Sequence, residues 1–420
     1  MISLRQTRIE PMLKDCCSVC NFADDGFIGI QFQEGLPHVS FPRGYTISDD
    51  DDTVRKDILG LITVLQRFSN QREGQNRIGD GEDQTAFPIL SYQYVIKDFI
   101  AHGYYTEHEV EHRLNDRGKI NWKRTIQQVQ PQVDNGNAVY LNFITKRSIN
   151  KANILTRIHE FCVYESFSKL GWLYLSTTYL PKKPSLRFNK KMFLATLNDA
   201  LKNTFNSDKK LLFSSMIEIV NCVEEQADLK DFQFGVPRFE YVWENLIDYV
   251  FGESNKDIYF PHAKWHIIAG GHTESSALEP DTVMKHDGKF YILDAKYYKF
   301  GITGLSAHLP ATSSIQKQIT YGDYIAARHF AESNDIYNAF VMPYAAREGD
   351  EPLKFVSVGT ADWIEYSSET ENYKYVLGIL LDTKHIMQTY TRHNAREILN
   401  MSQMILDSIQ AYRSENDYML

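Results

Sequence analysis

The chain has 420 residues, of which 43% are hydrophobic, 13% aromatic and 24% charged. This composition excludes an intrinsically disordered protein, and the length predicts two or three domains with substantial cores. The formal net charge of −9 argues against a protein that coats nucleic acid by bulk electrostatic attraction, although it is compatible with a local basic surface.

No segment of the sequence predicts export or membrane insertion. The first eleven residues contain no apolar core of a signal peptide, and the longest apolar runs, such as residues 376–381, are too short to cross a bilayer. We therefore expect no membrane partner and a cytoplasmic location. The five cysteines include one CxxC pair but no second pair to complete a zinc site, so we expect free thiols.

Residues 1–70 are predicted to form a mixed α/β segment. Short apolar runs at 27–32 and 38–42 indicate strands. Periodic apolar residues at 48–68 indicate a helix, whose early aspartates suit the positive end of the helix dipole. A polar, glycine-rich stretch at 71–84 is typical of a linker.

Residues 85–230 are predicted to be a mainly helical region that binds DNA or a partner, with one strand at 140–144. Within it, residues 117–124, RGKINWKR, surround Trp122 with positive charge. Basic runs are usually solvated loop faces, but this one is the best candidate for phosphate contacts. Its basic residues are Arg117, Lys119, Lys123 and Arg124.

A second pattern in the same region, HEVEH at residues 108–112, matches the HExxH helix of zinc proteases. A buried protease helix would have apolar neighbours, whereas the neighbours here are polar, and no third metal ligand follows. We therefore interpret these residues as part of an exposed helix.

The rest of the chain, residues 235–420, is predicted to form a mixed sheet flanked by helices, which is an α/β or α+β domain. Its elements are a helix at 238–252, a hairpin near 281–296, a helix at 312–330, three strands within 338–381 and a final helix from about 392 to 412.

The hairpin in residues 279–299 carries charges in an otherwise apolar sequence. Asp287-Gly288 between two apolar runs is a strong signal for a two-residue turn, because glycine tolerates positive φ. Pairing outward from this turn places Asp281 directly opposite Asp294, with Cβ atoms about 5 Å apart.

Lys296 lies on the same face as Asp294, since side chains alternate along a strand. Two carboxylates held opposite each other near a core repel, and a hard divalent cation would relieve that repulsion. The alternative is that Lys296 neutralises both aspartates in a structural ion cluster.

The pattern Pro280-Asp281 followed by Asp294-x-Lys296 resembles the PD-(D/E)XK signature of Mg²⁺-dependent nucleases. The resemblance implies that Asp281 and Asp294, with the Ala295 carbonyl as a further ligand, hold Mg²⁺, for which Mn²⁺ can substitute. Lys296 would orient the attacking water and stabilise the developing negative charge.

The helices on either side of the hairpin contribute two further candidates. In the PD-(D/E)XK nucleases the preceding helix often supplies a glutamate, and Glu244 matches that position. In related enzymes the following helix carries a polar residue that faces the active site, and Gln318 is a better candidate for this position than Gln316. A solvated surface position explains Glu244 about as well, and a glutamine near the start of a helix is usually only solvated.

Three more stretches sharpen the resemblance, namely residues 87–105, 117–126 and 154–173. Together with the nuclease motifs they are similar to the LlaJI family of restriction endonucleases, which is related to McrC, the nuclease subunit of GTP-driven McrBC-type systems. The resemblance spans residues 85–300 and implies a Mg²⁺-dependent endonuclease of an anti-phage restriction system. Its substrate would be double-stranded DNA, cut at a specific site.

Two alternatives stay open. The McrC relationship implies a nuclease active only with an AAA+ GTPase partner, to which residues 117–124 would dock. A non-catalytic DNA-binding protein is the other alternative, although the intact Asp/Asp/Lys set argues against it. No Walker A motif is present, so the chain is not expected to hydrolyse nucleotide itself, and a homodimer is also open.

Overall fold

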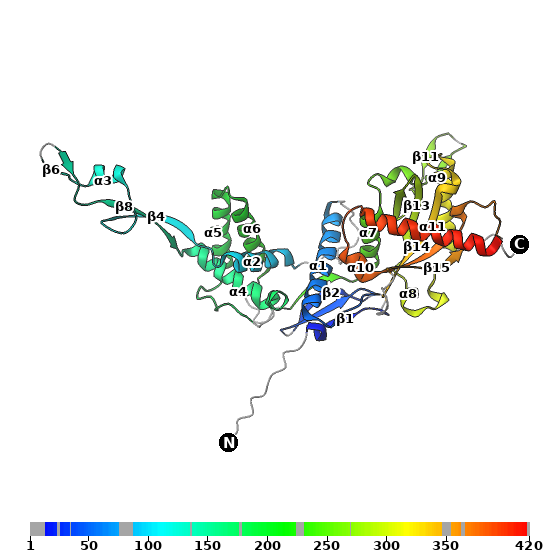
Figure 1. Ribbon diagram of the computed structural model, residues 1–420, viewed down its shortest axis with the longest axis horizontal. Helices are drawn as coiled ribbons and strands as arrows, with labels where there is room; N and C mark the ends of the chain where they lie inside the picture. The colour runs from blue at the N-terminus through cyan, green and yellow to red at the C-terminus, as the bar shows by residue number, and fades with distance from the viewer. Residues whose placement is uncertain are drawn as a thin grey trace, which may run out of the picture. The chain divides into compact units, whose positions relative to one another are not determined.

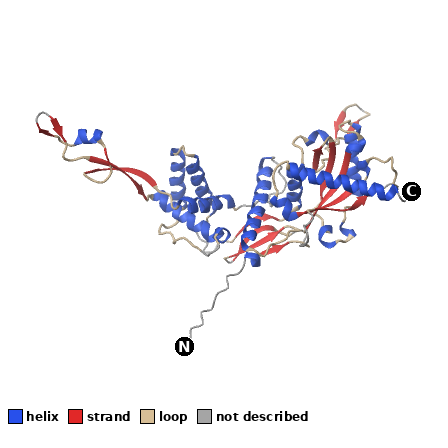
Figure 2. Ribbon diagram, viewed as in Figure 1, coloured by secondary structure: helices blue, strands red, loops and turns tan. Residues whose placement is uncertain are grey.

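The computed structural model describes residues 13–22, 26–33, 35–74, 87–134, 137–175, 179–223, 231–268, 270–346, 354–362 and 366–417. The chain divides into two compact units, shown in Figures 1 and 2. The first unit combines residues 1–86 with 231–420, and the second consists of residues 87–230.

A five-stranded mixed sheet forms the centre of the first unit, with strand order β12-β13-β14-β16-β15. The interior strands β13, β14 and β16 are parallel, whereas β12 and β15 run antiparallel at the two edges. The strands are β12 (Thr282–His286), β13 (Lys289–Ala295), β14 (Ile336–Tyr344), β15 (Phe355–Ala361) and β16 (Val376–Asp382). This arrangement confirms the predicted mixed sheet.

Helices cover this sheet (Figure 2). On α9, Tyr321 and Ile325 share a core with Val283 and Ile292 of the hairpin strands. Asp294 lies on the same face of β13 as Ile292, because side chains alternate along a strand. The helices of this part are α7 (Glu240–Phe251), α8 (Phe300–Thr303), α9 (Thr312–Ala327), α10 (Thr383–Gln388) and α11 (Ala395–Asp417).

The amino-terminal residues form a second sheet in the first unit, with strand order β1-β3-β2-β9. Its last strand comes from a distant part of the sequence. Gly29 of β2 and Gly235 of β9 pair so closely that a Cβ at Gly29 would lie 2.2 Å from the Phe234 carbonyl oxygen. The elements are β1 (Cys17–Val19), β2 (Ile28–Gln33), β3 (Leu36–Phe41), α1 (Asp51–Gly74) and β9 (Phe232–Val236).

A small hairpin precedes the main hairpin of the first unit. It pairs β10 (Lys264–His266) with β11 (His272–Glu274), and all six of these residues are exposed.

Helices and a long β-arm make up the second unit (Figure 1). The helices are α2 (Ile89–His102), α4 (Ile154–Tyr174), α5 (Lys190–Asn203) and α6 (Ser207–Cys222). We call the described residues between 107 and 151 the β-arm. It contains β4 (Glu107–Leu114), β5 (Lys119–Ile120), α3 (Trp122–Gln128), β6 (Gln132–Asp134), β7 (Asn137–Val139) and β8 (Ile144–Lys151).

The β-arm corrects three predictions for this region. The sequence predicts a mainly helical region, but the β-arm consists mainly of strands. Residues 108–112 lie on strand β4 rather than on a helix. The strand predicted at 140–144 begins only at Ile144. The reason is the eight-residue pairing of β4 with β8, which overrides local propensity. Positions four apart on a strand are separated by about 13 Å, so HEVEH cannot form an HExxH zinc site.

Two further expectations can be compared with the described residues. None of the helices within the described ranges is long and apolar enough to span a bilayer. All five cysteines are free thiols, as predicted.

Candidate active site

The predicted hairpin is present with the predicted register. Asp287 and Gly288 form its two-residue turn, with φ values of 48° and 74°. The pairing of β12 with β13 runs without a bulge from this turn, so its continuation brings Asp281 opposite Asp294. The local signal of the turn therefore fixes which carboxylates meet.

Hydrogen bonds hold the charged groups at the carboxyl end of β13. The main-chain N–H of Ala295 donates to Asp281 Oδ2 at 2.9 Å. Asp294 is only 3% exposed, and its Oδ2 pairs with Lys296 Nζ at 2.5 Å. The main-chain N–H of Lys296 donates to the carbonyl of Val341 at 2.9 Å, which continues the parallel pairing with β14.

Three carboxylates share the positive charge of Lys296. Burial raises the pKa of Asp281 to about 7, and the charges of Asp294 and Glu244 add to the rise. Burial also raises the pKa of Glu244, against the opposing effect of Lys296. Although burial alone would lower the pKa of Lys296, Asp294 and Asp281 together raise it. The structure thus brings together four of the predicted residues in a site with excess negative charge.

Lys256, which the sequence analysis missed, fixes the main chain of this site. Its ammonium donates to the carbonyl of Asp281 at 2.5 Å and pairs with Asp248 of α7 at 2.8 Å. Asp248 lies one helical turn after Glu244, so α7 supplies a carboxylate near Lys296 and an anchor for Lys256. No motif links Lys256 to the hairpin, and only its place in the fold identifies it.

Helix α9 lies beside the same carboxylates. Tyr321 donates its hydroxyl to the carbonyl of Glu279 at 3.0 Å, and its pKa is raised by burial and then by Asp294 and Asp281. One turn earlier, Gln318 is 1% exposed, and within the described ranges neither atom of its side-chain amide has a hydrogen-bond partner. A buried amide without a partner is costly. Gln318 is therefore not the solvated residue that the alternative interpretation expected.

The donor atoms of the site suit a hard cation. Asp281 and Asp294 each use one carboxylate oxygen in the contacts above, and the other oxygen of each has no hydrogen-bond partner among the described residues. Carboxylate and main-chain carbonyl oxygens are the ligands that Mg²⁺ accepts. The described residues contain no group of three or more His, Cys, Asp or Glu side chains arranged around one metal position. The described residues therefore fit a hard cation held by the carboxylates of two aspartates, without a third carboxylate, imidazole or thiolate arranged around it.

The predicted phosphate contacts lie on the β-arm of the second unit. Lys119 pairs with Lys146 across the ladder of β5 and β8, and like charges in such a position repel. Partial burial lowers the pKa of His112, and the charges of Arg124 and Lys146 lower it further. The basic residues of the predicted run, Arg117, Lys119, Lys123 and Arg124, are all exposed.

The first unit thus contains a mixed sheet covered by helices, with two aspartates and a lysine at adjacent strand ends. This arrangement is the one expected from the resemblance to restriction endonucleases. Residues 27–367 match the family described as LlaJI restriction endonuclease, and the chain belongs to this family. The family prediction is confirmed. The match also includes β2, β3 and α1, where the resemblance had assigned nothing.

A curated relative supports the same class. The chain is 23% identical over 304 residues to the Type II restriction enzyme BsuMI component YdjA of Bacillus subtilis (strain 168). The alignment covers 67% of this chain and 64% of that relative, which is less than two thirds of its length.

Proposed function

We propose that the protein is a Mg²⁺-dependent restriction endonuclease that hydrolyses phosphodiester bonds of double-stranded DNA at a specific site. The observation that supports this most is the convergence of Asp281, Asp294 and Lys296 at the ends of paired strands. Membership of a restriction endonuclease family supports nuclease activity in general.

Each residue of the site has a proposed task. Asp281 and Asp294 would hold the cation, with the Ala295 carbonyl as a further ligand. Bound Mg²⁺ would act as a Lewis acid toward the scissile phosphate. The Lys296 ammonium would orient the attacking water and stabilise the negative charge that develops on the phosphate. Glu244, whose pKa is raised by burial, would accept the proton of that water.

Gln318 would complete the site from α9. Its buried amide offers both a donor and an acceptor that no described residue uses. A DNA phosphate or a water molecule in the site would supply the missing partner.

Cleavage is expected to require Mg²⁺ or Mn²⁺, whereas Ca²⁺ should support DNA binding more than cleavage. The reason is the all-oxygen donor set, which selects hard cations. The measurement is nicking of a supercoiled plasmid in EDTA and after addition of each cation, with DNA binding followed by fluorescence anisotropy. Undiminished cleavage in EDTA would contradict the metal assignment.

Reversing charge on the β-arm is expected to weaken cleavage at least about 10-fold at low enzyme concentration, because phosphate contacts dominate affinity for DNA. The variant is Lys123→Glu with Arg124→Glu, since both residues are exposed. Binding of Mg²⁺, measured by calorimetry, should stay unchanged because the metal residues lie in the other unit.

The matched control is Lys202→Glu with Lys210→Glu, which makes the same charge change at exposed positions of α5 and α6. It is expected to cleave like the unaltered protein. Equal loss in both double variants would show a general effect of net charge, and wild-type cleavage by the β-arm variant would show that the basic run is only solvated.

A partner-dependent nuclease, like McrC with its AAA+ GTPase, is the second candidate function. The exposed apolar side chains on the β-arm favour it, because such residues are enriched at protein interfaces. They include Trp122, Ile126, Val133 and Leu141, which are 52%, 60%, 77% and 60% exposed.

The two candidates differ in a simple reconstitution. The purified protein is assayed alone and with any AAA+ protein encoded by a neighbouring gene, with and without GTP. Cleavage only in the presence of the partner and GTP would favour the second candidate. Binding of DNA without cleavage under either condition would favour a non-catalytic protein.

A further inference from the structure

Arg43 connects the amino-terminal sheet to the residue that follows Lys296. It is 2% exposed, and its Nη1 donates to the carbonyl of Tyr297 at 2.5 Å. Its guanidinium carbon lies 4.7 Å from the centroid of the Tyr297 ring. The main-chain N–H of Arg43 also donates to the Tyr297 hydroxyl at 2.6 Å. Three contacts thus join Arg43 to Tyr297.

Arg43 is itself held in place. Its Nε donates to the carbonyl of Asn21 at 2.9 Å, and its own carbonyl accepts from the Thr383 hydroxyl at 2.9 Å. Gly44 has φ +75°, and a Cβ there would lie 2.7 Å from the main-chain carbon of Tyr344. The loop after β3 therefore sits directly against the ends of β14 and β16, and Arg43 has little freedom to move.

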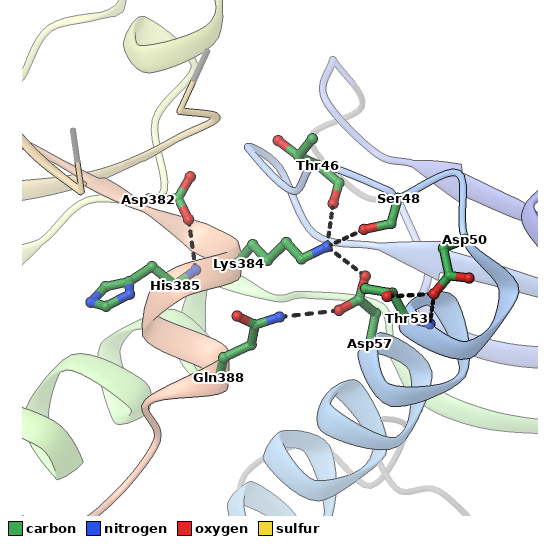
Figure 3. Close-up of polar contacts among 9 residues, drawn as sticks. All are labelled: Thr46, Ser48, Asp50, Thr53, Asp57, Asp382, Lys384, His385 and Gln388. Carbon is green, nitrogen blue, oxygen red and sulfur yellow. Dashed lines mark hydrogen bonds and ion pairs between the residues drawn. The ribbon is translucent and has the colours of Figure 1, made fainter. Parts of the chain in front are cut away.

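A second connection between the same two parts uses other residues. Lys384 Nζ lies 2.7 Å from Asp57 Oδ2 and 2.8 Å from Ser48 Oγ, and Gln388 donates to Asp57 Oδ1 at 3.2 Å (Figure 3). Asp57 is 2% exposed, so removing its partner leaves a buried charge unpaired. This cluster joins α1 to α10 (Figure 3), and within the described ranges the side-chain hydrogen bonds of Asp57, Lys384 and Gln388 involve no residue of β13.

We infer that Arg43 is a positioning residue of the nuclease site, acting through Tyr297 on Lys296. This inference rests on the proposed function. The main chain of Lys296 is held on one side by the Val341 carbonyl and on the other by the Arg43–Tyr297 contacts. Together they keep the Lys296 ammonium against Asp294. The planar guanidinium can donate to a carbonyl while it lies over the ring, and lysine cannot reproduce that geometry.

Arg43→Lys is expected to lower the single-turnover cleavage rate at saturating DNA by about 10- to 100-fold, the loss typical of small misplacements of reacting groups. The Kd for DNA, measured with Ca²⁺, should change less than about twofold, since this residue is buried away from solvent. The control is Lys384→Met, which breaks the other connection. It should lower Tm at least as much as Arg43→Lys, yet leave the rate per folded molecule unchanged.

A second measurement reads the position of Lys296 without cleavage. Lysines are reductively methylated with ¹³C, and the Lys296 signal is assigned by its loss in Lys296→Arg. Arg43→Lys should move this signal toward that of an exposed lysine, whereas Lys384→Met should not. This readout separates the inference from the proposed function, because it holds even if the unaltered protein cleaves no DNA.

The outcomes against the inference are equally definite. A rate that falls only in proportion to the unfolded fraction, in both variants alike, would make Arg43 a purely structural residue. Weaker DNA binding with an unchanged rate at saturation, or a Lys296 signal unaffected by Arg43→Lys, would also overturn it.

Discussion

Lys296→Ala is expected to reduce plasmid cleavage about 100- to 1000-fold, the loss typical when a group that stabilises transition-state charge is removed. Its side chain is 22% exposed, and its ammonium pairs with Asp294 in a site with an excess of carboxylates. Asp294→Ala is expected to lose cleavage for the complementary reason that a metal ligand is gone. The measurement is the initial rate of supercoiled-plasmid nicking.

Lys289→Ala is the matched control for this prediction. Lys289 is also on β13, but at the opposite end of the strand, where it lies 3.9 Å from Asp335. We expect near-normal cleavage from it. Circular dichroism of each variant verifies that the fold is retained, and full nicking by folded Lys296→Ala would remove the active-site assignment.

Asp281→Asn is expected to stabilise the metal-free protein at pH 8 by roughly 1 to 3 kcal/mol while greatly reducing cleavage. The pKa of Asp281 is raised from 3.8 to about 7, so the folded protein binds this proton more tightly than the unfolded chain does. The resulting stability is complete below the ordinary pKa and is lost as the pH rises through about 7. Asparagine stays neutral and keeps the acceptor for the Ala295 N–H.

Urea unfolding in EDTA at pH 5 and pH 8 provides the measurement. The unaltered protein should lose more stability between the two values than Asp281→Asn does, and saturating Mg²⁺ should restore stability only to the unaltered protein. Identical pH dependence of the two proteins would show that Asp281 does not carry the repulsion described for this site.

The candidate site was predictable to the extent that its geometry is local. Asp287-Gly288 determines a two-residue turn, and the turn determines that Asp281 meets Asp294. The helix that carries Glu244 follows from buried apolar residues at helical spacing. The catalytic and metal-binding roles of these residues remain predictions.

The parts that sequence reasoning missed depend on contacts between distant residues. The sequences of β4 and β8 are largely polar, so neither shows the alternation of apolar and polar residues that marks a half-buried strand, and only their pairing reveals them as strands. Arg43 and Tyr297 are separated by 254 positions, and Lys256 and Asp281 by 25. No spacing rule connects such pairs, because the fold alone brings them together.

The strand β9 has a consequence for the order in which the protein is made. It follows the entire second unit in the chain, yet it pairs with β2 and completes the sheet of β1, β3 and β2. During synthesis the edge of β2 therefore stays unpaired until the ribosome has passed residue 236. Asp281 and Asp294 are made later still, with the hairpin of β12 and β13. A chain that terminates early thus lacks the proposed catalytic residues before it lacks the second unit, so premature termination does not release the candidate active site without the second unit.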